Sequence, residues 1–243
     1  MGKWPVFVTA PRISLQALNR VLLLLLDYDL NEYHTDPLKH DWILLTSDQL
    51  PPFEIDPEMD IYDLPDSVKA KQLRVTPLPL TGPEVFTSTN NAFASWSPSR
   101  VRGFVDAPFT KERFRAHGIS PRDYIVIDQH GLETSTALLC RTYQGLEFSG
   151  DFEEIPPGDD ETGVRVRMPY EAMNGMMANL SIGHMAFEAW VDLDRGLQDE
   201  GSWRWQSFAP QGLDRAEYVG ARNAEGTRLR REMTLKWREA GLV

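Results

Sequence analysis

The chain has 243 residues, of which 42% are apolar and 25% are charged, and it carries a formal net charge of −11. These proportions are typical of folded globular proteins and exclude wholesale disorder and the fibrous classes. The negative charge disfavours uniform binding to a phosphate backbone, so we expect no DNA partner and cationic patches that are local at most.

The sequence contains neither a membrane span nor an export signal. Its longest apolar run, Val21–Leu26, has six residues, whereas a helix that crosses a bilayer needs about 20. The segment after Met1 lacks the apolar stretch of an export signal. The single cysteine, Cys140, lies in an apolar run where a strand would bury it. These features predict a cytoplasmic protein without a membrane partner.

The first fifty residues are predicted to form a strand, a helix and a second strand. Residues 5–9 are a short apolar run, and Ser14 precedes a helical repeat of leucine and valine from Leu15 to Leu25. A second apolar run, Trp42–Thr46, favours a buried strand. We therefore predict that residues 1–50 begin with a βαβ unit and belong to the main body.

Residues 51–95 are predicted to form a proline-rich arm. The many prolines and acids between positions 51 and 83 suit an extended excursion over the surface, with one short helix near Ser67–Arg74. Such a stretch either marks a domain boundary or packs along a single body.

Residues 96–208 are predicted to form the core unit of sheet and helices. Two short helices are expected first, Pro98–Phe104 and Thr110–His117, with Thr110 as the cap of the second. The apolar runs Tyr124–Asp128 and Thr136–Cys140 then predict adjacent strands at the centre of the sheet.

An acidic segment, Glu147–Glu161, separates these strands from the next ones and is expected to be a solvated loop. The alternating run Val164–Met168 predicts a half-exposed strand. Pro169 can open a helix that ends near Ala178, and a second helix is predicted over Ala186–Leu193.

The charged stretch Arg222–Glu239 predicts a C-terminal helix within residues 209–243. With few apolar positions, this helix is expected to dock weakly or to bind a protein partner. The predicted fold class is α/β or α+β: a central mixed β-sheet flanked by helices, with a long proline-rich arm.

Common cofactor signatures are absent from the sequence. It has no phosphate-binding glycine loop with lysine, no dinucleotide glycine fingerprint, no paired cysteines and no zinc-binding histidine pair on a helix. This pattern disfavours nucleotide-dependent, zinc and nicotinamide enzymes. We predict no bound cofactor and no metal, which leaves cofactor-free chemistry open.

Two candidate catalytic residues, Asp128 and His130, lie at the end of a predicted strand and just after it. In α/β proteins, ligands bind outside the carboxyl ends of the strands. His130 lies in this position and has carboxylates near it in the sequence, and an imidazole held by a carboxylate can act as a general base. The alternative is an ordinary polar connection between two strands.

A second candidate group lies between Met168 and Trp190. Met173 and Met177 are one helical turn apart, and together with Trp190 they could line an apolar pocket or simply pack in the core. His184 and Glu188, four residues apart on the second predicted helix, could project into that pocket as an acid and base pair. They could equally be a contact along one helix face.

Two basic segments stand out from the acidic chain. If the fold brings them together, they would form a cationic face that holds phosphates; each alone could be a solvated helix face. Their candidate tRNA-binding residues are Arg100, Arg102, Arg113, Arg115, Arg230 and Arg231.

Residues 96–208 resemble a family of uncharacterised bacterial and fungal proteins that is classed as a domain of unknown function. The resemblance rests on Tyr124–Asp128, Ala137–Cys140, Val164–Arg167, Asn179–Phe187 and Trp203–Arg204, of which Asn179–Phe187 is the most specific. It implies that residues 124–208 form one unit of sheet and helix, and it implies no activity.

The chain also resembles, in size and style, the fungal arginine-containing cyclodipeptide synthases, which join two amino acids from aminoacyl-tRNA. That family has two adjacent acids followed by a glutamate, whereas this chain has differently spaced acids at Asp192, Asp194 and Glu200. The resemblance implies that these carboxylates bind a cationic amino acid, that His130 or His184 transfers protons, and that the basic segments face tRNA.

The sequence leaves three hypotheses for the function. The first is a cytosolic biosynthetic enzyme that forms cyclodipeptides from aminoacyl-tRNA. The second is a non-catalytic acidic interaction module that uses the acidic segment and the C-terminal helix. The third is a cofactor-free cyclase or isomerase with an apolar pocket for a small molecule. The catalytic hypotheses need the loop after Asp128 and the turn near His184 to meet at one hollow.

Overall fold

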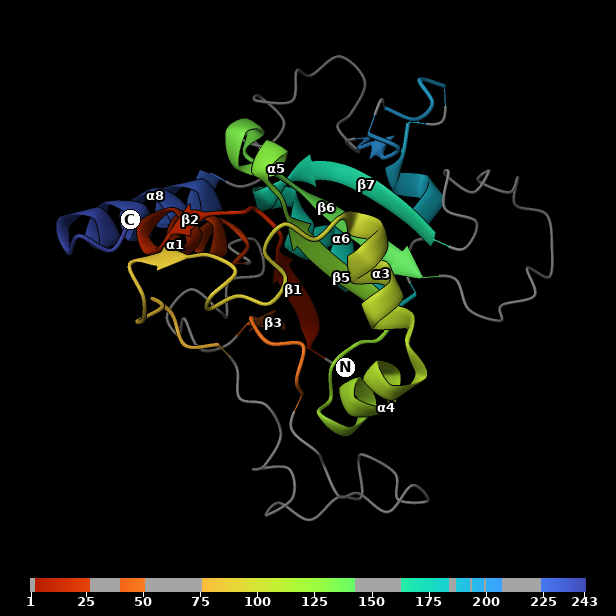
Figure 1. Cartoon of the computed structure of the whole chain (residues 1–243). Coiled ribbons are helices and arrows are strands. Elements are labelled where there is room, and N and C mark those ends of the chain that lie inside the picture. The colour runs from red at the N-terminus through yellow and green to blue at the C-terminus, as the bar shows by residue number, and fades with distance from the viewer. Residues whose placement is uncertain are drawn as a thin grey trace, which may run out of the picture.

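The computed structural model describes residues 3–26, 40–50, 76–142, 163–183, 187–192, 194–198, 200–206 and 224–243. Its main sheet has six strands in the order β3-β1-β5-β6-β7-β8 (Figure 1). Their bounds are β1 (Trp4–Val8), β3 (Trp42–Leu45), β5 (Asp123–Ile127), β6 (Thr136–Thr142), β7 (Gly163–Pro169) and β8 (Trp203–Arg204). The predicted fold class, a mixed α/β protein with a central mixed sheet flanked by helices, is confirmed.

The N-terminal part of the sheet is parallel and the remainder is mixed. Strand β1 pairs in parallel with both β3 and β5. Strand β6 is antiparallel to its two neighbours, and β8 runs parallel to β7. The predicted βαβ start and the central position of β5 and β6 are both confirmed. A separate two-stranded sheet pairs β2 (Ile13–Ser14) with β4 (Val85–Phe86).

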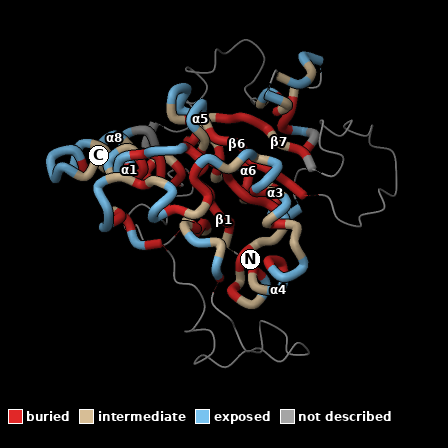
Figure 2. The backbone as a smooth tube through the Cα atoms, viewed as in Figure 1, coloured by how far each residue is buried: buried red, intermediate tan, exposed pale blue. Residues whose placement is uncertain are grey.

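Helices cover both faces of the main sheet. The helices are α1 (Leu15–Leu24), α3 (Pro98–Asp106), α4 (Pro108–Ala116), α5 (Gln129–Thr134), α6 (Tyr170–Ser181) and α8 (Ala224–Glu239). Side chains of α1, α6 and α8 share one hydrophobic core with one face of the sheet, and those of α3 and α4 share a second core with the other face. Figure 2 shows the buried strands between helices whose outer sides are exposed.

The strands serve both cores because successive side chains of a strand point to opposite faces. In β1, Val6 and Val8 pack in the core of α1, α6 and α8, whereas Phe7 packs in the core of α3 and α4. Cys140 of β6 is buried as predicted, and burial raises the pKa of its thiol to about 12. The thiol is therefore protonated at neutral pH.

Two predicted helices differ from those observed. Helix α4 begins at Pro108 rather than after Thr110, because proline at the first helical position has a suitable φ and no N–H to leave unpaired. The helix expected over Ala186–Leu193 is a single 3₁₀ turn, Phe187–Trp190. It ends there because Val191 leaves the helix to form an antiparallel bridge with Trp205.

The C-terminal helix is anchored on α1. Trp237 is only 4% exposed and belongs to the core of α1 and α6. The Nδ2 of Asn19 and the Nε2 of Gln16 donate to the carbonyl oxygens of Leu242 and Gly241, at 3.2 and 3.1 Å. The prediction of weak docking missed this contact, because Trp237 is buried in the core and Met233, Leu242 and Val243 pack against it, although the helix as a whole is charged.

The latter part of the predicted proline-rich arm packs on the body, since Leu78, Leu80 and Phe86 are buried in the core of α1. Residues 51–75, with the short helix expected at Ser67–Arg74, lie outside the described residues, as does the acidic segment Glu147–Glu161. Within the described part of the chain, no helix combines the length and the apolar character that a membrane crossing requires.

Candidate functional site

The candidate site lies at the edge of the sheet where β1, β3 and β5 end. The chain passes from β1 to β3 on one side and later returns to β5 on the other side of β1. Between the carboxyl ends of β1 and β5 the strand order therefore reverses, which is the place where α/β proteins bind ligands. The short helix α5 connects β5 to β6 at this edge (Figure 1).

The centre of the site is the guanidinium of Arg167, which is held between two carboxylates. Its Nη2 and Nη1 donate to Oδ2 and Oδ1 of Asp128 at 2.6 and 3.1 Å. Its Nε donates to Oε1 of Glu200, and Nη2 donates to Oε2 of the same residue at 2.9 Å. Both carboxylates are thus bound by two nitrogens, which is the strongest geometry for such pairs.

Arg167 is buried, with 6% of its side chain exposed, whereas its two partners are more accessible, at 21% for the side chain of Asp128 and 32% for that of Glu200. Burial alone would lower the pKa of Arg167, but the hydrogen bonds and charges of the two carboxylates raise it. Burial would likewise raise the pKa of Glu200, but hydrogen bonds from Arg167 and Ser202 lower it. Arg167 and Glu200 are therefore both charged at neutral pH.

The short helix α5 is fixed from three directions. The Oδ1 of Asp128 accepts from the backbone N–H of Gly131 at 2.7 Å, which caps the helix. The hydroxyl of Tyr170, at the start of α6, donates to the carbonyl oxygen of Gly131 at 2.8 Å. A Cβ at position 131 would lie 2.2 Å from the carbonyl oxygen of Thr136. Only glycine fits here, so α5 sits tightly against the start of β6.

His130 lies on this fixed helix and its side chain is exposed. His130 is close enough to Glu200 that a positive charge on the imidazole lowers the pKa of the Glu200 carboxyl group. The structure therefore brings together His130 and Asp128, which were predicted as catalytic, and Glu200, which was predicted as substrate-binding. Among the residues that the structure describes, no three histidine, cysteine or acidic side chains are grouped as ligands for a metal ion.

Glu200 is held in place by a second arginine of β7. The Nε and Nη2 of Arg165 donate to the carbonyl oxygens of Gly201 and Glu200 at 3.0 and 2.8 Å. Gly201 has a φ of 70°, a left-handed conformation that favours glycine. Arg165 and Arg167 thus attach the turn before β8 to the sheet, on the face opposite to Val164 and the core of α6.

Sequence reasoning missed the three residues that organise the site: Arg167, Tyr170 and Ser202. The alternation in residues 164–168 did place the arginines on the polar face of a strand, which was the available signal. It could not show that the carboxylates of Asp128 and Glu200, far away in the sequence, meet this face.

The other acids named as substrate-binding lie apart from the cluster. Asp192 accepts from the backbone N–H of Arg195 at 3.2 Å and pairs with its Nε at 3.4 Å, while Asp194 is exposed. Because Glu200 already binds the guanidinium of Arg167, its carboxylate is not open to the guanidinium of a substrate in this arrangement.

The candidate pocket residues Met173, Met177 and Trp190 are buried members of the core that lies under α1 and α6. This is the packing alternative that the sequence left open. His184 and the side chain of Glu188 lie outside the described residues. Helix α6 starts beside α5 at Tyr170 and runs for 12 residues, so its far end lies about 16 Å along its axis. Ile182 and Gly183 follow that far end, so among the described residues the loop after Asp128 and the chain before His184 do not meet at one hollow. Any role of His130 therefore depends on the Arg167 cluster and not on a hollow shared with His184.

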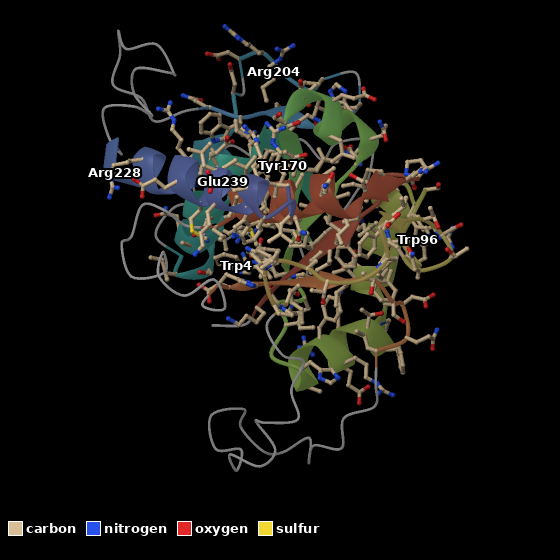
Figure 3. All side chains as sticks on the ribbon, turned by 90° about the vertical axis from the view of Figure 1, so that its left-hand side faces the viewer. Trp4, Trp96, Tyr170, Arg204, Arg228 and Glu239 are labelled. Carbon is tan, nitrogen blue, oxygen red and sulfur yellow. The ribbon has the colours of Figure 1, made fainter. Side chains whose placement is uncertain are left out.

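The two basic segments do not form one cationic face. Helices α3 and α4 cover one side of the sheet, whereas α8 lies with α1 on the other side. Figures 1 and 3 both show this separation, with Trp96 and Arg228 on opposite sides of the body in Figure 3. The condition for a joint face is not met, because α3 and α4 pack in the core that contains Phe7 while Trp237 of α8 packs in the other core.

The basic residues of α3 and α4 mostly have partners within the chain. Arg100 stacks on Trp96 at 4.0 Å and Arg113 on Phe109 at 4.7 Å. The Nε of Arg102 pairs with Asp106 at 3.3 Å. Arg115 of α4 and Arg231 of α8 are exposed, and Arg230 is half-buried.

Comparisons with protein-family models, with curated proteins and with solved structures found no match for this chain. The resemblance of residues 96–208 to a domain of unknown function, and that of the chain to cyclodipeptide synthases, therefore stay predictions.

Proposed function

We propose that this protein is an enzyme that acts on a small polar molecule without a bound organic cofactor, and that His130 transfers a proton in the reaction. The observation that carries this proposal is the position of an exposed imidazole at the carboxyl edge of the sheet, on a turn of helix held by Asp128 and Tyr170. Catalytic groups need such fixed placement, since small displacements cost much of the rate.

The charged cluster gives the imidazole a suitable neighbour. Arg167 and Ser202 keep Glu200 ionised by lowering its pKa. A carboxylate beside an imidazole stabilises the imidazolium that forms when histidine accepts a proton. Arg167 stays charged because its two carboxylate partners raise its pKa. It therefore binds charge and transfers no proton, and the proton transfer that we propose belongs to the imidazole of His130.

The loop beside the ends of β1 and β5 carries one residue in a strained backbone conformation, Ser95. The backbone N–H of Ser95 donates to the carbonyl oxygen of Thr9 at 2.9 Å. The backbone N–H of Thr9 donates to the carbonyl oxygen of Ile127 at 2.8 Å. Ser95 is exposed and has a φ of 66°. Non-glycine residues in this left-handed region cluster at functional sites.

His130→Ala is the direct test of this proposal. Small molecules from a heterologous host that expresses the wild-type chain, the variant or neither would be compared by mass spectrometry. We expect a product that depends on the wild-type chain and that falls at least about 100-fold in the variant, the usual contribution of a general acid or base. Because His130 is exposed, thermal unfolding should stay nearly unchanged.

Glu133→Gln is the matched control, since Glu133 is exposed on the same short helix. It should retain the product. Equal amounts of product from the His130→Ala chain, or the same small molecules with and without the wild-type chain, would contradict the proposal.

Aminoacyl-tRNA as the source of the substrate is a second candidate, and it rests on α3 and α4 alone. The stacked pairs of Arg100 on Trp96 and Arg113 on Phe109 combine cations with aromatic rings, as single-stranded nucleic acid sites do. We expect charged tRNA to bind at 50 mM salt and to dissociate steeply as salt rises. Arg100→Glu with Arg115→Glu should weaken this binding at least about tenfold by adding like charges.

The control for the tRNA experiment is Arg231→Glu with Arg238→Glu, which changes the net charge equally but lies on α8, across the sheet. It should leave tRNA binding within about threefold of wild type. An equal loss in both double variants, or no binding at 50 mM salt, would refute a tRNA site on α3 and α4.

A further inference from the structure

Helix α8 has one face that packs on the body and one that faces outward. Trp237 and Met233 pack in the core with α1. On the outer side lies Leu235, which is 47% exposed and is surrounded by exposed charged residues. Figure 3 views α8 from its outer side, between Arg228 and Glu239. A single exposed leucine is ordinary on a protein surface, so the case for a contact here depends on how the charges around Leu235 are arranged.

The charges on this outer face are sorted into two rows. An α-helix has 3.6 residues per turn. The residues four positions before and three positions after Leu235 therefore lie on one side of it, about 40–60° around the helix axis. These are Arg231 and Arg238. Positions three before and four after lie at about the same angle on the other side. These are Glu232 and Glu239, so a basic row and an acidic row flank the leucine. Arg228, two turns before Leu235, also lies on the acidic side and pairs with Glu232, so the N-terminal end of the acidic row carries a cation.

Such a face is complementary to itself in one orientation. When two copies of α8 lie parallel and are related by a twofold axis along the helices, the basic row of each copy faces the acidic row of the other. Leu235 then meets Leu235 of the second copy. In an antiparallel pair, like rows would face each other and repel.

We propose that the outer face of α8 is a docking surface for a second copy of this chain, which it binds as a parallel, twofold-symmetric helix pair. The surface is the set Arg231, Glu232, Leu235, Arg238 and Glu239. It lies on the far side of α8 from Trp237, so the pair forms without displacing the helix from α1.

The dimer should be weak and concentration-dependent. Helix α8 has 16 residues, which is about 24 Å, and one such helix buries less than the roughly 800 Å² per partner of a standard stable interface. The net charge of −11 on each copy adds repulsion. Glu232 also pairs within its own helix with Arg228 at 2.5 Å, an exposed contact that is readily exchanged.

Charge reversal of one row at a time tests the pair. Sedimentation velocity over a range of concentrations at physiological salt would compare the full wild-type chain with Glu232→Lys/Glu239→Lys and with Arg231→Glu/Arg238→Glu. Each variant then presents two rows of like charge, so we expect each to associate at least about tenfold more weakly than wild type. An equimolar mixture of the two variants should associate again, because a fully basic face then meets a fully acidic one.

Arg100→Glu/Arg115→Glu serves as the control, since it changes the net charge as much as the basic-row variant does but lies on the opposite side of the sheet. Its association should match wild type, and all variants should share one unfolding temperature because the residues are exposed. A wild-type chain that stays monomeric at every concentration, an association that both row variants retain, or a mixture that does not recover would each overturn the proposal.

Discussion

Arg167→Ala is expected to lower the free energy of unfolding by about 3 kcal/mol, the lower end of the range for breaking a buried ion pair. The guanidinium neutralises two carboxylates, Asp128 and Glu200, and the side chain of Arg167 is only 6% exposed. Without it, both acids lose two hydrogen bonds each and face one another as like charges. For a chain of this size the loss corresponds to about 6–12 °C in the midpoint of thermal unfolding.

The effect of Arg167→Ala should depend on pH in a defined direction. In the wild-type protein the pKa of Glu200 is lowered on folding, so its ionised form adds stability above the ordinary glutamate value of about 4.3. That contribution is lost as the pH falls through the lowered, folded-state value. In the variant, burial without a cation favours the neutral acid. The difference between the two proteins should therefore be largest near pH 7 and shrink below about pH 4.

Arg195→Ala is the matched control for this experiment. Arg195 also pairs with an acid, Asp192, but its side chain is 72% exposed, and surface pairs of this kind contribute less than about 1 kcal/mol. Chemical denaturation of both variants at pH 7 and at about pH 3 would separate the two cases. Equal stability losses in the two variants would mean that the Arg167 cluster is no more important than a surface contact.

Residue patterns predicted the strands of the sheet because those strands are almost entirely buried. Tyr124 to Ile127 and Ala137 to Cys140 are continuous apolar runs, and the structure buries every residue of both. A strand with helices on both faces must be apolar on both sides, so its signal is local and strong. Ser14 likewise predicted the start of α1. In the structure its side-chain oxygen accepts a hydrogen bond from the backbone N–H of Ala17, as an N-cap residue does.

The site itself depends on pairings that no local pattern carries. Arg167 meets Asp128 and Glu200 only because β6 and β7 pair in one register, which places Leu138 opposite Arg167. A shift of one residue would turn Arg167 into the core and Met168 out of it. Similarly, the sequence gives no indication that α3 and α8 lie on opposite faces of the sheet. Which face a helix covers depends on the order of the strands, which is a property of the whole chain.

Gly131→Ala is expected to be as destabilising as the loss of Arg167, for a steric reason rather than an electrostatic one. The new Cβ would lie 2.2 Å from the carbonyl oxygen of Thr136 and 2.9 Å from Oδ1 of Asp128. Neither atom can simply move away, since the first is backbone at the start of β6 and the second binds Arg167. Overpacking at such a site costs about 1–3 kcal/mol, and the lost cap of α5 adds about 1 kcal/mol.

Comparing Gly131→Ala with His130→Ala distinguishes the structural role of α5 from the chemical role proposed for His130. If α5 is displaced, Tyr170 loses its acceptor at position 131 and His130 moves away from Glu200. Gly131→Ala should therefore lose both product formation and stability, whereas His130→Ala should lose product formation alone. Gly103→Ala is the control, because a Cβ at that helical position meets no atom within 4 Å and alanine favours the helix. If the Gly131→Ala and Gly103→Ala chains unfolded at the same denaturant concentration, this result would contradict a tight contact between α5 and β6. It would then also contradict the fixed position of α5 on which the proposed role of His130 depends.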